Sequence, residues 1–297
     1  MFHRIALLGS ALLIYRQIEE SLALVRNVHI VTGGNGFIGR HIVNELIHGE
    51  IMNDDGKLSG MNGNVDVVYS LVRGRKVEKE QEWIDSVLEG CQGDNYCGEV
   101  HAFPYDMLDD GVSLEKCLTH IRERYCEDCG EGNGLSVTVY HVASTFGPTE
   151  DHERTALENV KGTEDLILAC AKHSCQVHRI ILTSSMAAVR ATNQKPINGQ
   201  CYSYEDWNTA SQLGLNWGSS YQWSKMQSEK RAWELCQSND LKDSLQLVTL
   251  CPSFVFGPSL GPSNSYSVDI VSKWAKGQAE VQSRLCVDVR DIARVSK

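Results

Sequence analysis

The sequence has no surplus of basic residues: 28 lysines and arginines stand against 38 aspartates and glutamates, for a formal net charge of −10. This balance argues against a nucleic acid or an anionic membrane as partner. It also has no strong membrane signal, because the apolar run Ile5–Tyr15 is far shorter than the about 20 residues that cross a bilayer. No cleavage pattern follows that run. We expect residues 1–26 to be a leader or an additional helix of a cytoplasmic protein, a membrane-associated leader being the alternative.

The sequence also lacks a completed metal-binding motif. Cys126 and Cys129 form a Cys-x-x-Cys pair, with Cys91, Cys97 and Cys117 before it, and no second pair or histidine pair completes a zinc site. The total of 11 cysteines is odd, and they are scattered through the chain. That usage fits reduced cytosolic thiols better than a disulfide framework. We therefore predict no metal.

A glycine-rich turn near residue 33 is the clearest sign of chemistry. It follows a short apolar run, Val28–Val31, and precedes hydrophobic residues at helical spacing. Gly33 suits the tight turn, Gly36 a close approach of phosphates, and Gly39 close packing of helix on strand. The helix N-terminus then offers free N–H groups to an anion. We expect a dinucleotide pyrophosphate to bind here, against Gly33, Gly36, Phe37, Ile38 and Gly39.

Strand-like and helix-like stretches alternate along the chain of 297 residues. The predicted strands are Val28–Val31, Val65–Val72, Val100–Phe103, Ser136–His141, His178–Thr183 and Leu245–Leu250. The predicted helices are Gly36–His48, Leu114–Arg124, Thr155–His173 and Tyr221–Cys236. This order predicts an α/β fold with a doubly wound parallel sheet, the Rossmann type. Residues 49–64 and 74–98 are predicted to be loop insertions, with helical packing around 83–88 as the alternative for the second.

Arg73 stands at the predicted end of the second strand, where NAD-selective sites carry an acidic residue. A guanidinium pairs well with a 2′-phosphate. The sequence therefore favours NADP(H) over NAD(H).

Tyr221 and Lys225 are four residues apart on a predicted helix and so share a face. A tyrosine pKa of about 10 is high for proton exchange at neutral pH, and a nearby ammonium lowers it. The pair therefore suits a general acid acting on a carbonyl. Ser184 and Ser185 close the preceding predicted strand, where a hydroxyl could polarise the same carbonyl.

Several strings together resemble the extended short-chain dehydrogenase/reductases of the NAD-dependent epimerase/dehydratase superfamily, and most of all the dihydroflavonol reductase and cinnamoyl-CoA reductase branch. The resemblance runs from Val28 to Val295 and rests on strings such as VTGGNGFIGRHIV, YHVASTFGP, RIILTSSMAAV and SSYQWSKMQSEKRAWE. It implies a Rossmann fold, NADP(H) and reduction of an aldehyde or ketone.

The resemblance also assigns residues. It implies Ser185, Tyr221 and Lys225 as the catalytic set, with Ser184 as the neighbouring option. It places Asp106 at the adenine amine. Asn159 matches a position that helps a proton relay in some members. The further cofactor contacts that it implies are Met107, Val142, Ala143, Ser144 and Pro252. Tyr221 and Lys225 are expected to contact the cofactor as well, with Lys225 holding the nicotinamide ribose.

The resemblance extends to the domain plan and leaves the substrate open. Residues 27–297 are expected to form one NAD(P)-binding domain, with substrate-region segments at about 191–218 and 252–286 and an incomplete C-terminal substrate region. Four aromatic residues suggest an apolar site: Tyr202, Trp207, Trp217 and Trp223. Two alternatives to a small-carbonyl reductase stay open, a 3β-hydroxysteroid-type dehydrogenase and a non-catalytic NADP(H)-binding regulatory module.

Overall fold

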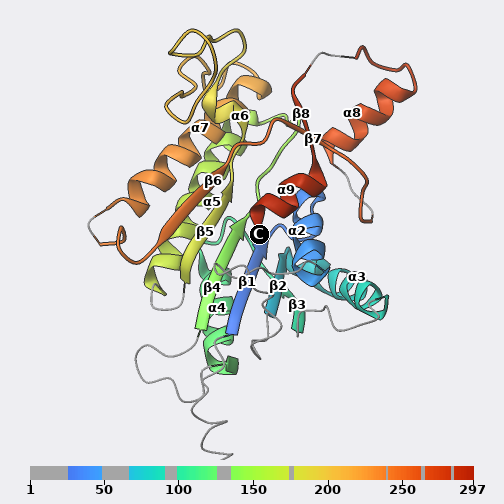
Figure 1. The fold of residues 1–297 in the computed structure, drawn as a ribbon, viewed down its shortest axis with the longest axis vertical. Helices are drawn as coiled ribbons and strands as arrows, with labels where there is room; N and C mark the ends of the chain where they lie inside the picture. Colours follow the sequence, from blue (N-terminus) through green and yellow to red (C-terminus); the bar gives the residue numbers. More distant parts are fainter. Residues whose placement is uncertain are drawn as a thin grey trace, which may run out of the picture.

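The computed structural model describes residues 26–48, 67–90, 99–125, 135–173, 177–238, 240–261, 265–281 and 284–297. Six parallel strands form one sheet in the order β3-β2-β1-β4-β5-β6 (Figure 1). They are β1 (Arg26–Thr32), β2 (Val67–Val72), β3 (Glu99–Pro104), β4 (Leu135–His141), β5 (Val177–Thr183) and β6 (Gln246–Leu250). The order reverses between β1 and β4, which is where ligands bind in such sheets. The predicted doubly wound fold is confirmed.

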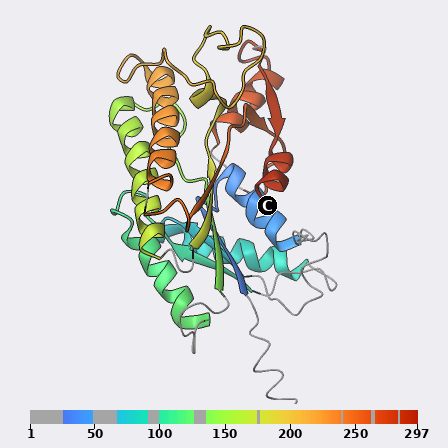
Figure 2. The ribbon, with the colours of Figure 1, turned by 60° about the vertical axis from the view of Figure 1, so that its left-hand side comes forward.

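Helices cover both faces of this sheet. On one side lie α4 (Val112–Tyr125), α5 (His152–Lys172) and α7 (Trp217–Cys236); on the other lie α2 (Phe37–His48) and α3 (Val77–Glu89). In Figure 2, α5 and α7 stand on one side of the strands and the blue α2 on the other. Alternate residues of β1 point to the two layers: Val28 and Ile30 pack with α4 and α5, and Val31 packs with α2. Since both faces are covered, β2 is buried at every position.

The prediction that residues 74–98 form a loop insertion is wrong for most of that stretch. A short 3-10 turn, η2 (Gly74–Lys76), leads into α3, which buries Ile84 completely and Glu80 to 1% exposure. The sequence of this stretch is mostly polar because α3 buries only one narrow stripe of side chains and exposes its other sides to solvent. Residues 91–98 and the other predicted insertion, 49–64, lie outside the described residues, as do residues 1–25.

The C-terminal part adds a small parallel pair, β7 (Phe254–Phe256) and β8 (Cys286–Asp288), joined through α8 (Tyr266–Ala275). The last helix, α9 (Val289–Ser296), buries Val289, Ile292 and Ala293 and packs beside α2 (Figure 1). These elements occupy much of the predicted substrate segment 252–286. Within the described residues, no helix is both long and apolar enough to cross a membrane.

Candidate active site

A cavity of about 1570 Å³ runs along the carboxyl ends of the strands. It joins the glycine turn to the Ser185, Tyr221 and Lys225 side chains. Twelve of the predicted cofactor residues line it: Gly33, Gly36, Phe37, Ile38, Arg73, Met107, Val142, Ala143, Ser144, Tyr221, Lys225 and Pro252. Gly39 and Asp106 do not line it. The fold therefore brings most of the predicted residues to one continuous space.

The glycine turn has the geometry that its spacing predicts. Gly33 has φ +69°, a conformation that suits glycine, and its carbonyl accepts the Gly36 N–H at 2.8 Å. A Cβ on Gly39 would overlap that same carbonyl, so Gly39 permits the close packing of α2 on the turn. A Cβ on Gly34 would overlap the Ser70 hydroxyl. The turn is thus a cradle that side chains would fill, and it fits a pyrophosphate at the α2 N-terminus.

Basic side chains gather where the adenosine part of a dinucleotide would lie. Arg73 is exposed directly after β2, and Arg75, Lys76 and Lys79 line the same end of the cavity. The predicted contact of Arg73 with a 2′-phosphate stays a prediction, and the other three residues add positive charge that the sequence reasoning did not single out.

One acidic residue at this end of the cavity, Glu80, is paired with an arginine. Glu80 accepts hydrogen bonds from Ser70 at 2.9 Å and from Arg40 at 3.0 Å. The Arg40 guanidinium also lies over the Trp83 ring, 4.7 Å from its centre. Sequence reasoning missed this pairing because it joins two helices, one of which it had predicted as a loop.

Asp106 has a local role in this structure. Its carboxylate accepts the Leu108 N–H at 3.0 Å, which shapes the turn after β3. The neighbouring Met107 lines the cavity and packs on α5, where a Cβ on Gly162 would overlap it. The predicted contact of Asp106 with the adenine stays a prediction.

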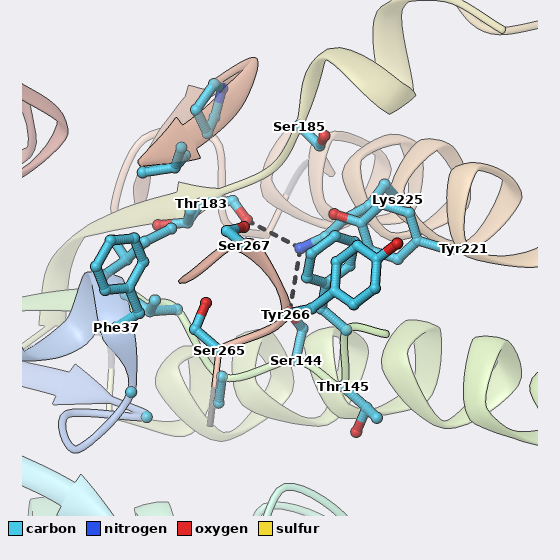
Figure 3. Close-up of a pocket in the computed structure, with 18 of the residues that line it drawn as sticks. Phe37, Ser144, Thr145, Thr183, Ser185, Tyr221, Lys225, Ser265, Tyr266 and Ser267 are labelled. Carbon is cyan, nitrogen blue, oxygen red and sulfur yellow. Dashed lines mark hydrogen bonds between the residues drawn. The ribbon is translucent and has the colours of Figure 1, made fainter. Parts of the chain in front are cut away.

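We call the part of the cavity that holds Ser185, Tyr221 and Lys225 the reacting end. It is built from α7 and the end of β5 (Figure 3). Asn216 caps α7 by accepting the Ser219 N–H at 2.9 Å. Tyr221 and Lys225 then lie one turn apart on the helix. Ser185 follows β5 and caps the short α6 (Met186–Val189), accepting the Ala187 N–H at 3.1 Å.

Lys225 is buried and tied to two strand ends. Its ammonium donates to the Ser144 hydroxyl at 3.3 Å and to the Thr183 carbonyl at 3.2 Å, the two dashed lines of Figure 3. Burial lowers the pKa of Lys225 to about 8. Burial raises the pKa of Tyr221 to about 12, and its hydrogen bond with Ser185 acts in the opposite direction. The Tyr221 pKa is therefore shifted upward, opposite to the lowering expected from the lysine, and burial is the largest cause of this shift.

The two adjacent serines have different surroundings. Ser184 is buried and donates a 2.5 Å hydrogen bond to the Glu229 carboxylate. Ser185 is half-buried and lies by Tyr221. The structure thus favours Ser185 over Ser184 as the hydroxyl that meets a substrate.

Asn159 clamps the chain after β4. Its side chain accepts the Thr145 N–H at 2.8 Å and donates to the Thr145 carbonyl at 3.0 Å. Both ends of the amide are therefore used to hold the backbone beside Ser144.

Aromatic rings surround Tyr221. The Phe146 ring lies 4.7 Å from that of Tyr221 and 5.4 Å from that of Tyr266, centre to centre. Trp217 also lines the cavity, as predicted, 5.6 Å from Tyr266. Three other predicted aromatics do not line it: Tyr202, Trp207 and Trp223. Sequence reasoning missed Phe146 and Tyr266, although Phe146 lies within the string YHVASTFGP.

The predicted cysteine cluster mostly falls outside the described residues, which include Cys117 but not Cys91, Cys97, Cys126 or Cys129. Cys117 lies on α4 and is fully buried in the core. Within the described ranges, no group of three or more metal-ligating side chains is found.

Comparison with known families gives one match that covers most of the chain. Residues 31–276 match the family described as "Male sterility protein". This span runs from the end of β1 through α8, so it includes the glycine turn and the whole reacting end.

Individual relatives are reductases. Cinnamoyl-CoA reductase 1 of Arabidopsis thaliana is 34% identical over 164 residues, which cover 52% of this chain and 43% of that protein. The NADPH-dependent methylglyoxal reductase GRE2 of Saccharomyces cerevisiae is 25% identical over 240 residues, 77% of this chain and 58% of that protein. The chain thus spans about half the length of the curated relatives that it matches.

Solved structures share the fold. The yeast methylglyoxal/isovaleraldehyde reductase Gre2 complexed with NADPH superposes with a TM-score of 0.67 at 23% identity, covering 91% of this chain and 72% of that one. Gre2 of Candida albicans in complex with NADPH gives 0.67 at 25% identity, with the same coverage of both chains.

Proposed function

We propose that this chain is an NADP(H)-dependent oxidoreductase. It belongs to the NAD-binding family described as "Male sterility protein", within the extended short-chain dehydrogenase/reductases. It reduces an aldehyde or ketone to an alcohol, and the reaction is reversible. The observation that carries this proposal is the convergence of Ser185, Tyr221 and Lys225 in the same cavity as the glycine turn.

The cofactor assignment rests on the fit of the residues present. The turn offers α2 N–H groups and a space free of Cβ atoms to the pyrophosphate. Arg73 lines the cavity together with Arg75 and Lys79, and this cluster of positive charge supports the assignment of a 2′-phosphate to Arg73. Two relatives support the same choice, since the curated yeast reductase is NADPH-dependent and the Candida albicans structure is an NADPH complex.

The protein's own groups supply the proton and hold the carbonyl. When bound against the glycine turn, NADPH would supply the hydride that the carbonyl carbon accepts. The Tyr221 hydroxyl gives its proton to the carbonyl oxygen, and the Ser185 hydroxyl donates a hydrogen bond to that oxygen. Lys225 keeps a positive charge beside the tyrosine, which favours the phenolate left behind. Solvent then returns the proton.

We also propose that residues 27–297 form one NAD(P)-binding domain whose substrate side comes from about 191–218 and 252–286. Thr192 and Trp217 of the first segment line the cavity, as do Phe254, Tyr266 and Leu285 of the second. The cytoplasmic location stays a prediction from composition.

The test is to incubate the purified chain with NADPH and a panel of aromatic and aliphatic aldehydes and ketones. Turnover is measured as the loss of NADPH absorbance. Consumption of NADPH with formation of the matching alcohol supports the proposal. Tight NADPH binding with no alcohol from any carbonyl would favour the regulatory module, and NAD⁺-linked oxidation of a 3β-hydroxysterol alone would favour the steroid dehydrogenase.

A further inference from the structure

A buried carboxylate lies directly behind the reacting end. Glu229 is on α7, one turn after Lys225, and is 6% exposed. It accepts the Ser184 hydroxyl at 2.5 Å and lies 3.4 Å from the Cys251 thiol, which also donates to it. Ser184 follows β5 and Cys251 follows β6. One carboxylate thus joins α7 to the two strand ends that carry Ser185 and Pro252.

Two hydrogen bonds do not by themselves explain why a glutamate stands at this buried position. A glutamine oxygen at the same place accepts the same bonds without the free-energy cost of a buried charge. A buried carboxylate is favourable only where a cation shares its surroundings. Lys225, itself buried at 8% exposure, lies four residues earlier on the same helix, and this spacing puts both side chains on one face.

The other titratable groups around Lys225 are neutral at neutral pH. Burial lowers the pKa of His141 on β4 to about 3, so this imidazole is uncharged. Burial raises the pKa of Tyr221 and of Cys251 to about 12 each, so the phenol and the thiol keep their protons. Two neighbours, Cys251 and then Glu229, act to raise the Lys225 pKa that burial lowers. Because the Cys251 thiol keeps its proton, Glu229 is the one of these groups that can bring a negative charge to the ammonium.

We propose that Glu229 is a positioning residue of this site: its carboxylate holds Lys225 in the charged form and fixes the strand ends that carry Ser185 and Pro252. This proposal rests on the proposed function for its consequence in turnover, but the charge state of Lys225 can be measured without turnover. Glu229 touches no substrate, since it acts through Lys225 and Ser184.

The experiment follows the reactivity of Lys225 with acetic anhydride as a function of pH, by mass spectrometry, in the full chain. Only the neutral amine reacts, so the midpoint of labelling reports the loss of the ammonium. Glu229→Gln should move the midpoint to lower pH by about one unit, because an opposite charge is removed. The matched control is Glu234→Gln, on the same helix at 64% side-chain exposure, which should leave the midpoint where the wild type has it. A midpoint in Glu229→Gln equal to that of the wild type would overturn the proposal.

Two further variants separate charge from packing. Ser184→Ala removes the hydrogen bond and keeps the carboxylate, so it should lower thermal stability and leave the labelling midpoint in place. An equal fall of the midpoint in Ser184→Ala would contradict the role of the charge. If Glu229→Gln does not fold, Ser184→Ala combined with Glu229→Leu removes the carboxylate and its hydroxyl donor together, and leaves only the weakly donating Cys251 thiol without this acceptor. This double variant should then show the same downward shift, and an unchanged midpoint would again contradict the proposal.

The pH dependence of kcat tests the same proposal through activity. The alkaline limb of kcat should move to lower pH in Glu229→Gln by the same amount as the labelling midpoint, and stay in place in Glu234→Gln. If the wild type reduces no carbonyl, the proposed function fails, while the labelling result still decides the role of Glu229. If the wild type turns over and the limb of Glu229→Gln does not move, the proposal about Glu229 fails and the proposed function stands.

Discussion

The Lys225 ammonium donates a 3.2 Å hydrogen bond to the carbonyl of Thr183, the last residue of β5. A second bond, to the Ser144 hydroxyl after β4, fixes the same nitrogen at 3.3 Å. A helix side chain thus joins two neighbouring strand ends on the wall of the cavity that also holds Tyr221. This contact places a buried positive charge beside the proposed general acid.

Replacing Lys225 with methionine should therefore reduce kcat strongly, by about 10²-fold or more, because the charge that favours the Tyr221 phenolate is lost. Methionine keeps most of the packing volume but removes two hydrogen bonds and leaves Glu229 without its cation, so the thermal midpoint should also fall. Steady-state kinetics and thermal unfolding measured together check this. A variant that keeps its kcat would show that the ammonium has no part in proton transfer.

The two serines after β5 should respond differently. Ser185→Ala should lower kcat by about 10²-fold, since a donor to the carbonyl oxygen is removed. Ser184→Ala should cost about 1–3 kcal/mol in the free energy of unfolding, because a buried carboxylate loses a partner, and should lower kcat by less than tenfold. Urea unfolding and kinetics on both variants provide the comparison. The reverse pattern would assign the catalytic hydroxyl to Ser184.

Arg73→Ala should raise the KM for NADPH by about 10- to 100-fold and leave the KM for NADH nearly unchanged, because a charge-assisted bond to the 2′-phosphate is lost. Arg122→Ala, on the exposed side of α4, serves as the control for overall charge. Equal effects on the two cofactors would contradict the position assigned to the 2′-phosphate.

Two buried histidines should make the fold sensitive to acid. Burial lowers the pKa of His29 to about 4 and that of His141 to about 3, whereas the unfolded chain titrates at about 6.5. Between pH 6.5 and 4 the unfolded state therefore binds protons that the folded state does not. Each histidine should then reduce the free energy of unfolding by about 1.4 kcal/mol for each pH unit of acidification, an effect absent above pH 6.5.

Urea unfolding of the wild type and of His141→Gln at several pH values tests this, because glutamine removes one titrating group and retains polar atoms. The difference in unfolding free energy between the two proteins should shrink or change sign as the pH falls. A constant difference from pH 7 to pH 4.5 would mean that His141 does not resist protonation in the folded protein.

The sequence was informative wherever a function depends on neighbouring residues. The spacing of Gly33, Gly36 and Gly39 and the pair Tyr221 and Lys225 are local patterns, and the structure brings both to one cavity. The fold class and the family resemblance are confirmed by the sheet order and by the family match.

What the sequence could not supply depends on contacts between distant segments. The pairing of Arg40 with Glu80 spans 40 positions, and the hydrogen bond from Ser184 to Glu229 spans 45. No local period in the sequence marks either pair. The different surroundings of Ser184 and Ser185, and the pairing of Glu80 with Arg40, are therefore visible only in the three-dimensional structure. Phe146 and Tyr266 are 120 positions apart in the chain, and their contact could not be read from the sequence for the same reason.

The central claim is that Tyr221 delivers a proton to a carbonyl while NADPH is bound at the glycine turn. Its most direct test is Tyr221→Phe, with NADPH affinity from fluorescence titration and turnover on the best carbonyl of the wild-type panel. Phenylalanine keeps the ring against Phe146 and removes the proton. We predict that kcat falls by about 10²- to 10⁴-fold and that the Kd for NADPH stays within a few-fold of the wild type. Unchanged turnover in this variant would contradict the claim.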